Sequence, residues 1–318
     1  MRKLLTILII ITLILTFNLS GTAAKQFMAI ATGGTGGTYY PLGGALAQLL
    51  SNKVEDLVVT AQTGNASVAN CNLIGRHQIE TAFAQANTTY WAYSATGILA
   101  DTEPITNLRG IASLYPETIH IIATKESGVK TIADLKGKSV GVGAPNSGTA
   151  ADAEIILKAH GLSFDDLNID YIDFNEVAAR LIDGQIDAGF TTAGYPTSSV
   201  INIATVRDIV LIPVDLEVAQ KLVEEIPYYG ITEIPSGMYP GVEEPVRALA
   251  TPALWICDSQ LDPTLVYKMT KALWENVDIL AQVHAKGKDV TLETALDGMG
   301  VPLHAGAELY YKEIGLIK

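Results

Sequence analysis

Residue types that would mark an enzyme or a metal site are scarce in this sequence. Its 318 residues include only two cysteines and five histidines, and the histidines are scattered without the spacing of metal ligands. The zinc motif H-E-x-x-H does not occur. Adjacent acid pairs such as Asp165 and Asp166 lie in polar turns and are typical of a solvated surface. We therefore expect no metal, no cofactor and no enzymatic activity.

Basic residues are also in the minority. The sequence has 21 Lys and Arg against 34 Asp and Glu, which gives a formal net charge of −13. Such a surface repels the phosphates of nucleic acid and of anionic lipid, so we expect neither as a partner. The two cysteines, Cys71 at a predicted helix start and Cys257 in a predicted buried strand, are expected to be separate buried thiols.

The first 24 residues have the pattern of a secretory signal peptide. Arg2 and Lys3 are followed by an almost entirely apolar run to Phe17, and small residues end the segment at Ala24. A retained membrane anchor is disfavoured because the run is shorter than the roughly 20 residues that span a bilayer. We expect a periplasmic or secreted mature chain that begins at Lys25, with no later segment apolar enough to cross a membrane.

The rest of the chain alternates strand and helix patterns in two sets. The predicted strands are 27–32, 57–62, 81–85, 118–124, 139–142, 169–172, 188–191, 209–213 and 249–257, and the predicted helices are 42–51, a helix from about 67, 131–135, 150–160, 176–181 and 263–276. This alternation predicts doubly wound, mostly parallel sheets with helices on both faces. Residues 226–245, rich in Pro, Gly and Tyr, are predicted to be an ordered loop.

We predict an α/β protein of two domains. A discontinuous domain I comprises residues 25–118 and 247–318, and domain II, residues 119–246, is inserted into it. Two strands cross between the domains and act as the hinge.

Four strand ends are followed by loops of glycine and hydroxyl residues that open helices. They are GGTGGTYYP (33–41), TGNAS (63–67), PNSGT (145–149) and TTAGYP (191–196). Free N–H groups at helix starts attract anions, and ligands of open α/β sheets bind at the carboxyl ends of strands. The first loop has neither a G-x-G-x-x-G nor a phosphate-loop spacing, and alone it fits a tight turn without a ligand equally well. Because each domain contributes two such loops, we expect them to line one cleft.

Longer segments extend this pattern to most of the mature chain. They include GGTGGTYYPLGGALA (33–47), TGNASVAN (63–70), LRGIASLYPETIHIIA (108–123), SGVKTIADLKGKSVGVGAPNSGT (127–149), DGQIDAGFTTAGYPTSS (183–199), LVYKMTKALWEN (265–276) and VPLHAGAELYYKEIGL (301–316). Together they resemble the TAXI family of solute-binding subunits of TRAP transporters. The resemblance implies a type II-like periplasmic-binding-protein fold that closes around its ligand, and a TRAP membrane permease as partner.

The resemblance also implies a ligand and the residues that bind it. The ligand is a small carboxylate, namely glutamate, glutamine or a related dicarboxylate. The implied ligand-binding residues are Gly36, Thr38, Tyr39, Ser67, Gln85, Asn87, Ser147, Gly148, Thr149, Thr192 and Gly194.

One position departs from the family pattern. Gln85-Ala86-Asn87 stands where the resemblance leads us to expect Q-S-D. Loss of that carboxylate shifts preference toward a dicarboxylate without an amino group if the residue contacts the ligand, and is silent if it does not. Two other functions are compatible with the fold: a ligand-sensing input protein for a signalling receptor, and an enzyme. The enzyme is disfavoured because Ser67 and Ser147 have no base at a recognisable spacing.

Overall fold

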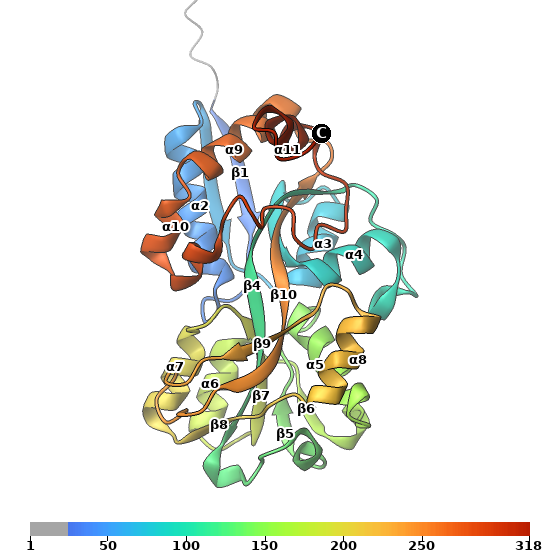
Figure 1. Cartoon of the computed structure of the whole chain (residues 1–318), viewed down its shortest axis with the longest axis vertical. Helices are drawn as coiled ribbons and strands as arrows, with labels where there is room; N and C mark the ends of the chain where they lie inside the picture. The colour runs from blue at the N-terminus through green and yellow to red at the C-terminus, as the bar shows by residue number, and fades with distance from the viewer. Residues whose placement is uncertain (1–24) are drawn as a thin grey trace, which may run out of the picture.

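The computed structural model describes residues 25–318, and the predicted signal peptide lies outside the described residues. Figure 1 shows two lobes joined by two long strands, β4 (Leu108–Thr124) and β10 (Val246–Asp258). We call the part made by residues 25–115 and 253–318 lobe 1, and the part made by residues 118–250 lobe 2. The domain boundaries predicted from the sequence fall within β4 and β10 themselves and stay a prediction.

Within residues 25–318, ten strands form one mixed sheet that continues through both lobes. Besides β4 and β10 they are β1 (Gln26–Ala31), β2 (Leu57–Gln62), β3 (Thr81–Gln85), β5 (Ser139–Gly141), β6 (Asn168–Asp170), β7 (Ala188–Ala193), β8 (Ile209–Leu211) and β9 (Gly230–Ile234). The order is β2-β1-β3-β10-β4-β7-β5-β6, with β8 beside β4 and β9 beside β10. Among the described pairs, every antiparallel one includes β4 or β10, and the others are parallel.

Helices cover both faces of the sheet in each lobe (Figure 1). Lobe 1 contains α2 (Tyr39–Lys53), α3 (Ser67–Gly75), α4 (Ala86–Ser94), α9 (Pro263–Glu275), α10 (Asp278–Val283) and α11 (Ala305–Glu313), with the 3₁₀ turns η1 (Gly97–Leu99) and η5 (Ala285–Asp289). Lobe 2 contains α5 (Gly148–Ala159), α6 (Phe174–Ile182), α7 (Ser198–Val206) and α8 (Leu216–Glu225), with η2 (Lys125–Ser127), η3 (Ile132–Leu135) and η4 (Phe164–Asp166).

Each lobe has an apolar core on each face of its sheet. In lobe 1, Leu46 and Trp255 belong to a cluster under α2 and α9, and Cys71 belongs to the cluster on the opposite face. Lobe 2 is built in the same way. Both cysteines are buried and unpaired, and burial raises the pKa of the Cys71 thiol to about 12. No helix within residues 25–318 is both long and apolar enough to span a bilayer.

The two connecting strands are weakened where they pass between the lobes. Pro116 of β4 lies opposite Pro252 of β10, and neither has an N–H to donate to the ladder. The register also shifts between Ala253 and Leu254, directly beyond this pair. Because two facing residues lack a backbone N–H, we expect the sheet to bend most easily at this level.

The two-lobed α/β fold with two crossover strands agrees with the sequence prediction, and the differences are local. The predicted loop 226–245 contains β9, which pairs with β10 along an edge. Helices α4, α7 and α8 were not predicted; the sequence of α4, ANTTYWAYS, is rich in residues of low helix propensity. The predicted strand 118–124 is only the second part of the 17-residue β4. The predicted helix 131–135 is a 3₁₀ turn.

Candidate functional site

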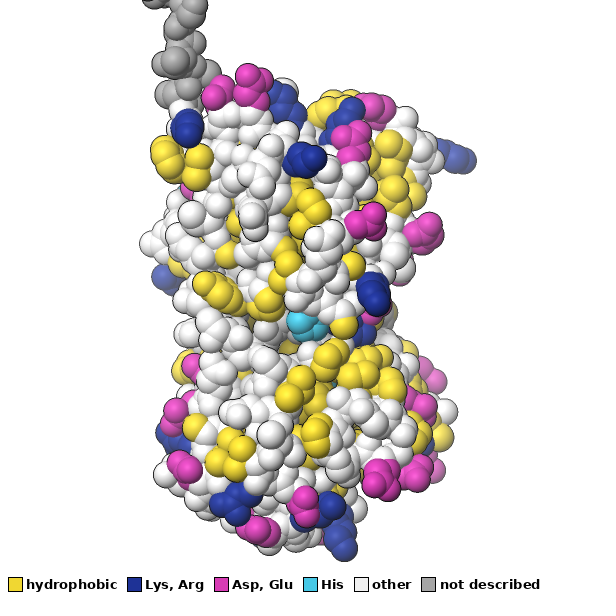
Figure 2. Space-filling view, turned by 90° about the vertical axis from the view of Figure 1, so that its left-hand side faces the viewer, with side chains coloured by type: hydrophobic (Ala, Val, Ile, Leu, Met, Phe, Trp, Pro, Cys, Tyr) yellow, Lys and Arg dark blue, Asp and Glu magenta, His cyan; other side chains and the backbone are white. Residues whose placement is uncertain are grey.

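A cavity lies between the lobes, beside the strands that connect them. In Figure 2 the molecule narrows at this level. The space between its lining atoms is about 520 Å³ when its opening to solvent is included. The described residues that line it are Gly33, Gly34, Gly37, Thr38, Tyr39, Gly64, Asn65, Ala66, Ser67, Gln85, Glu117, Ala144, Ser147, Gly148, Thr149, Asp173, Phe174, Thr192 and Ala193.

Four helices begin at the wall of this cavity, α2 and α3 from lobe 1 and α5 and α6 from lobe 2. At the start of α5, the Oγ of Ser147 accepts the N–H of Ala150 at 3.1 Å. The N–H groups of Gly148 and Thr149 have no acceptor within residues 25–318. Both the free N–H groups and the aligned helix dipoles therefore favour negative charge at this end of the cavity.

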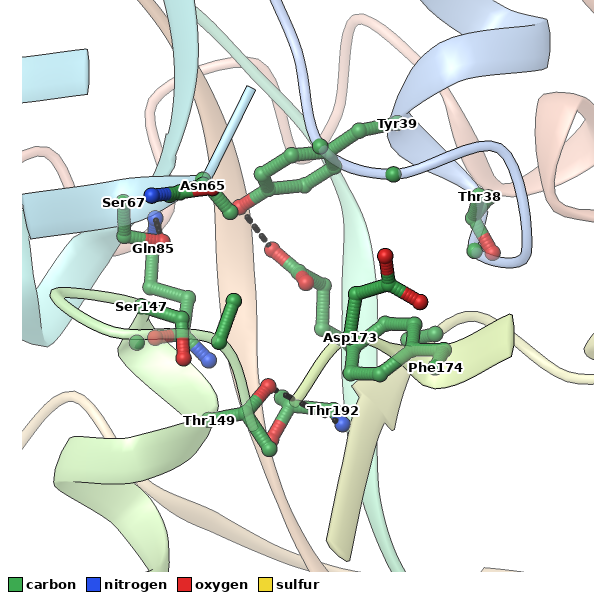
Figure 3. Close-up of a pocket in the computed structure, with 18 of the residues that line it drawn as sticks. Thr38, Tyr39, Asn65, Ser67, Gln85, Ser147, Thr149, Asp173, Phe174 and Thr192 are labelled. Carbon is green, nitrogen blue, oxygen red and sulfur yellow. Dashed lines mark hydrogen bonds between the residues drawn. The ribbon is translucent and has the colours of Figure 1, made fainter. Parts of the chain in front are cut away.

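Eight of the residues that the sequence predicted to bind the ligand line the cavity. Figure 3 shows most of them around one space, with Tyr39 and Ser67 from lobe 1 facing Ser147, Thr149 and Thr192 from lobe 2. The full set is Thr38, Tyr39, Ser67, Gln85, Ser147, Gly148, Thr149 and Thr192. Their convergence follows from the parallel strands, whose carboxyl ends in both lobes point toward the gap.

The other three predicted residues lie outside the lining. The carbonyl oxygen of Gly36 accepts a hydrogen bond from Ser198 Oγ at 3.1 Å, and that of Gly194 accepts one from Thr38 Oγ1 at 3.0 Å. Both glycines therefore contribute to contacts between the lobes. Asn87 is fully buried behind the cavity wall.

Sequence reasoning missed several lining residues, among them Glu117, Asp173 and Phe174. Asp173 is the N-cap of α6, where its Oδ1 accepts the N–H groups of the second and third helical residues at 2.8 and 3.0 Å. An Asp before an amphipathic helix is a recognisable start signal. Glu117 had a weaker signal: a single acidic residue directly before the apolar run 118–124.

Glu117 is the buried carboxyl of the cavity. Glu117 is 3% exposed. The hydroxyl of Tyr39 donates a hydrogen bond to Glu117 Oε1 at 2.5 Å, which Figure 3 draws as a dashed line from Tyr39. Burial raises the pKa of Glu117 well above its usual range, against the opposing effect of the tyrosine hydrogen bond. Among the described lining residues, none is Lys, Arg or His. The cavity therefore holds no side-chain cation to pair with this carboxyl.

A second buried carboxyl, Asp152 of α5, lies behind the wall and joins the two lobes. Its Oδ2 accepts hydrogen bonds from Gln85 Nε2 and Thr192 Oγ1, both at 2.8 Å. Its Oδ1 accepts them from Tyr229 OH at 2.6 Å and Asn87 Nδ2 at 3.2 Å. Burial raises the pKa of Asp152 despite these four donors. Because Gln85 and Asn87 belong to lobe 1, their bonds to Asp152 exist only while the lobes are together.

Further contacts between the lobes flank the cavity. Asn175 Nδ2 of lobe 2 donates to Thr35 Oγ1 of lobe 1 at 2.9 Å. In a second contact between the lobes, Lys286 Nζ of lobe 1 lies 3.9 Å from the centre of the Tyr195 ring of lobe 2. With the Asp152 network, these contacts show that the structure is a closed arrangement of the two lobes.

One enzyme-like sequence motif carries no catalytic arrangement. Residues 137–141 (GKSVG) match the spacing G-x-S-x-G. Ser139, however, begins β5, and its N–H is bonded to Asp187 Oδ2 at 2.9 Å, so it does not occupy a strand-to-helix turn. Among residues 25–318, no group of three or more His, Cys, Asp or Glu is placed to hold a metal ion.

A family model described as the NMT1-like family matches residues 30–315, nearly all of the described chain. The chain belongs to the NMT1-like family. This assignment is coarser than the resemblance to TAXI subunits, which stays a prediction.

Solved structures place the fold among the periplasmic binding proteins. A protein of Bordetella bronchiseptica is 19% identical, with a TM-score of 0.55 over 89% of this chain and 82% of that one. The binding-protein component of a phosphonate ABC transporter from Pseudomonas aeruginosa is 10% identical, with a TM-score of 0.53 over 84% and 80%. The ligand-binding component of an ABC-type import system from Staphylococcus aureus, solved with zinc, is 10% identical, with a TM-score of 0.51 over 92% and 93%. The predicted fold class is confirmed.

Proposed function

We propose that this protein is an extracytoplasmic solute-binding receptor that captures a small solute between its lobes and delivers it to a membrane transporter. The observation that carries the proposal is the cavity itself, which is walled by four helix starts, two from each lobe. A site built from both lobes is complete only when they close. The predicted signal peptide supports export, and the solved proteins named above as transporter components support transport.

Closure about the hinge is the proposed mechanism. The paired Pro116 and Pro252 mark the level at which β4 and β10 bend. When the lobes meet, Gln85 and Asn87 reach Asp152, and Thr38 reaches Gly194. Closure also removes water from the cavity, which strengthens each polar contact with the bound solute. Release requires the transporter to favour the open arrangement.

The proposed solute carries a carboxylate. The free N–H groups of Gly148 and Thr149, with the hydroxyls of Ser67 and Ser147, supply hydrogen-bond partners for it without a lysine or arginine. Glutamate and glutamine, which the TAXI resemblance implies, have a carboxylate of this kind. The same resemblance supports a TRAP permease as partner, while two of the solved proteins named above belong to ABC-type systems.

Ligand-induced stabilisation tests the receptor function. The chain from Lys25 is unfolded and refolded to remove carried-over solute, and its melting temperature is measured with amino acids and dicarboxylates. A solute that binds only the folded protein, at 100 times its Kd, adds about 2.7 kcal/mol to the free energy of unfolding. No shift with any carboxylate would contradict the proposed ligand class. Uptake in vesicles with a purified TRAP permease, driven by an ion gradient without ATP, tests the partner.

A further inference from the structure

Glu117 occupies a place in the cavity that the binding of a carboxylate does not explain. It projects from β4 next to the hinge residue Pro116, and it lines the same cavity as the helix starts. Only its Oε1 has a hydrogen-bond partner within residues 25–318, the hydroxyl of Tyr39. Its Oε2 is left for a ligand in the wall of a site that both lobes enclose.

The groups around Glu117 supply no positive charge from the described lining of the cavity. Tyr39 and Tyr115 are its phenolic neighbours, and the buried carboxyl of Asp152 acts on it electrostatically. Asp173 is the other carboxyl that lines the cavity. Lys286, the buried cation at the lobe interface, lies outside the lining and is bonded to Asp289 at 2.8 Å. Any cation that pairs with Glu117 must therefore come with the ligand.

We infer that Glu117 is a specificity-determining residue, which pairs with an ammonium group on the ligand while the helix starts hold the ligand's carboxylate. The inference rests on the proposed function and assigns one residue a role within it. A dicarboxylate without an amine places only negative groups against this wall. A zwitterion offers its carboxylate to the free N–H groups and its ammonium to Glu117, whose carboxylate would be costly to bury without a partner.

The pairing has a consequence for protons. Burial raises the pKa of Glu117 in this closed arrangement, which favours the protonated carboxyl there, and an ammonium that enters beside it displaces the proton into solvent. Binding of a zwitterion therefore releases a proton, and its affinity rises with pH until the raised pKa of Glu117 is passed. For a ligand with a carbonyl in place of the amine, the protonated carboxyl is the better partner, so its affinity falls as pH rises.

Glutamate and 2-oxoglutarate are the matched probes, because they share both carboxylates and differ only in the amine or keto group at one carbon. Titration calorimetry of the ligand-stripped mature chain, in buffers of different ionisation enthalpy between pH 5.5 and 8, measures affinity and proton release together. We expect tighter binding of glutamate, with proton release. In Glu117→Gln we expect at least about 30-fold weaker glutamate binding, no proton release, and little change for 2-oxoglutarate.

Two controls separate this role from a structural one. Tyr39 can still donate to the amide oxygen of the introduced glutamine, so we expect Glu117→Gln to keep the melting temperature of the ligand-free protein. Glu233→Gln removes an exposed carboxylate from β9, and we expect it to leave both affinities unchanged. Glutamate binding that is equal in wild type and Glu117→Gln, or tighter binding of 2-oxoglutarate than of glutamate by the wild type, would overturn the inference and leave the receptor function standing. Failure of the wild type to bind any carboxylate would overturn both.

Discussion

A carboxylate at position 87 should make closure sensitive to pH. Asn87 Nδ2 lies 3.2 Å from Asp152 Oδ1, and the Asn87 Oδ1 accepts the N–H of Thr88 at 2.8 Å, which fixes the orientation of the amide. In Asn87→Asp one oxygen keeps the bond to Thr88, and the other faces the Asp152 carboxylate. This is the residue type that the TAXI resemblance leads us to expect here.

The size of the effect follows from the distance. Two ionised carboxylates 3.2 Å apart repel each other by about 5 kcal/mol at an effective dielectric of 20. Holding one proton on an aspartate of ordinary pKa at pH 7 instead costs about 4 kcal/mol, and at pH 4.5 less than about 1 kcal/mol. Holding the proton costs less than the repulsion, so in the closed state one of the two carboxyl groups is protonated. The carboxyl pair that shares this proton thus has a raised pKa in the closed state. Closure is therefore favoured below the ordinary pKa of aspartate and is weakened as pH rises.

Calorimetry from pH 4.5 to 8 checks the predicted pH dependence by measuring the glutamate affinity of Asn87→Asp relative to wild type. The ratio cancels any titration of the ligand and of Glu117. We expect at least about 30-fold weaker binding than wild type at pH 7, shrinking to within about 5-fold at pH 4.5. Asn87→Ala removes the donor without adding charge, and its loss should not depend on pH. A ratio for Asn87→Asp that stays the same at every pH would refute the closed-state proximity to Asp152.

Two further predictions concern the lobe contacts and the core. Thr38→Val removes the hydrogen bond to Gly194 O, and we expect about 5-fold weaker ligand binding with nearly unchanged urea unfolding of the ligand-free protein; a large loss of unfolding free energy would assign Thr38 a structural role. His120 is fully buried, its Nε2 is bonded to Tyr239 OH, and burial lowers its pKa to about 4. Because the folded-state pKa is depressed, the contribution of neutral His120 to the free energy of unfolding is complete above about pH 6.5 and is lost as pH falls toward 4. We expect urea unfolding to show a loss of up to about 3 kcal/mol over this range. An equal pH dependence in His120→Gln would exclude His120 as the source.

Local sequence signals predicted most of the fold and of the cavity. Strands 57–62 and 81–85 have the bounds that their apolar runs indicate. The glycine and hydroxyl loops placed the starts of α2, α3 and α5 to within three residues, because a strand end, its glycines and the next helix start are encoded within a few neighbouring positions. Parallel topology then brought these loops together without further information.

The residues that sequence reasoning missed act through distant partners. Glu117 belongs to the cavity because β4 crosses between the lobes, and its only described partner, Tyr39, is 78 positions away. Asp152 lies inside a helix that the sequence predicted, yet its donors come from three other parts of the chain. Gly36 and Gly194 were predicted as ligand-binding residues, but closure uses their carbonyl oxygens to join the lobes. No local pattern separates these roles.

Small-angle X-ray scattering of the ligand-stripped mature chain, before and after addition of a mixture of amino acids and dicarboxylates, tests the central claim most directly. The account predicts that the stripped protein is more open and that its radius of gyration falls when the solutes are added. A scattering profile that stays the same with and without the solutes would contradict a receptor that closes around its ligand at the hinge of Pro116 and Pro252.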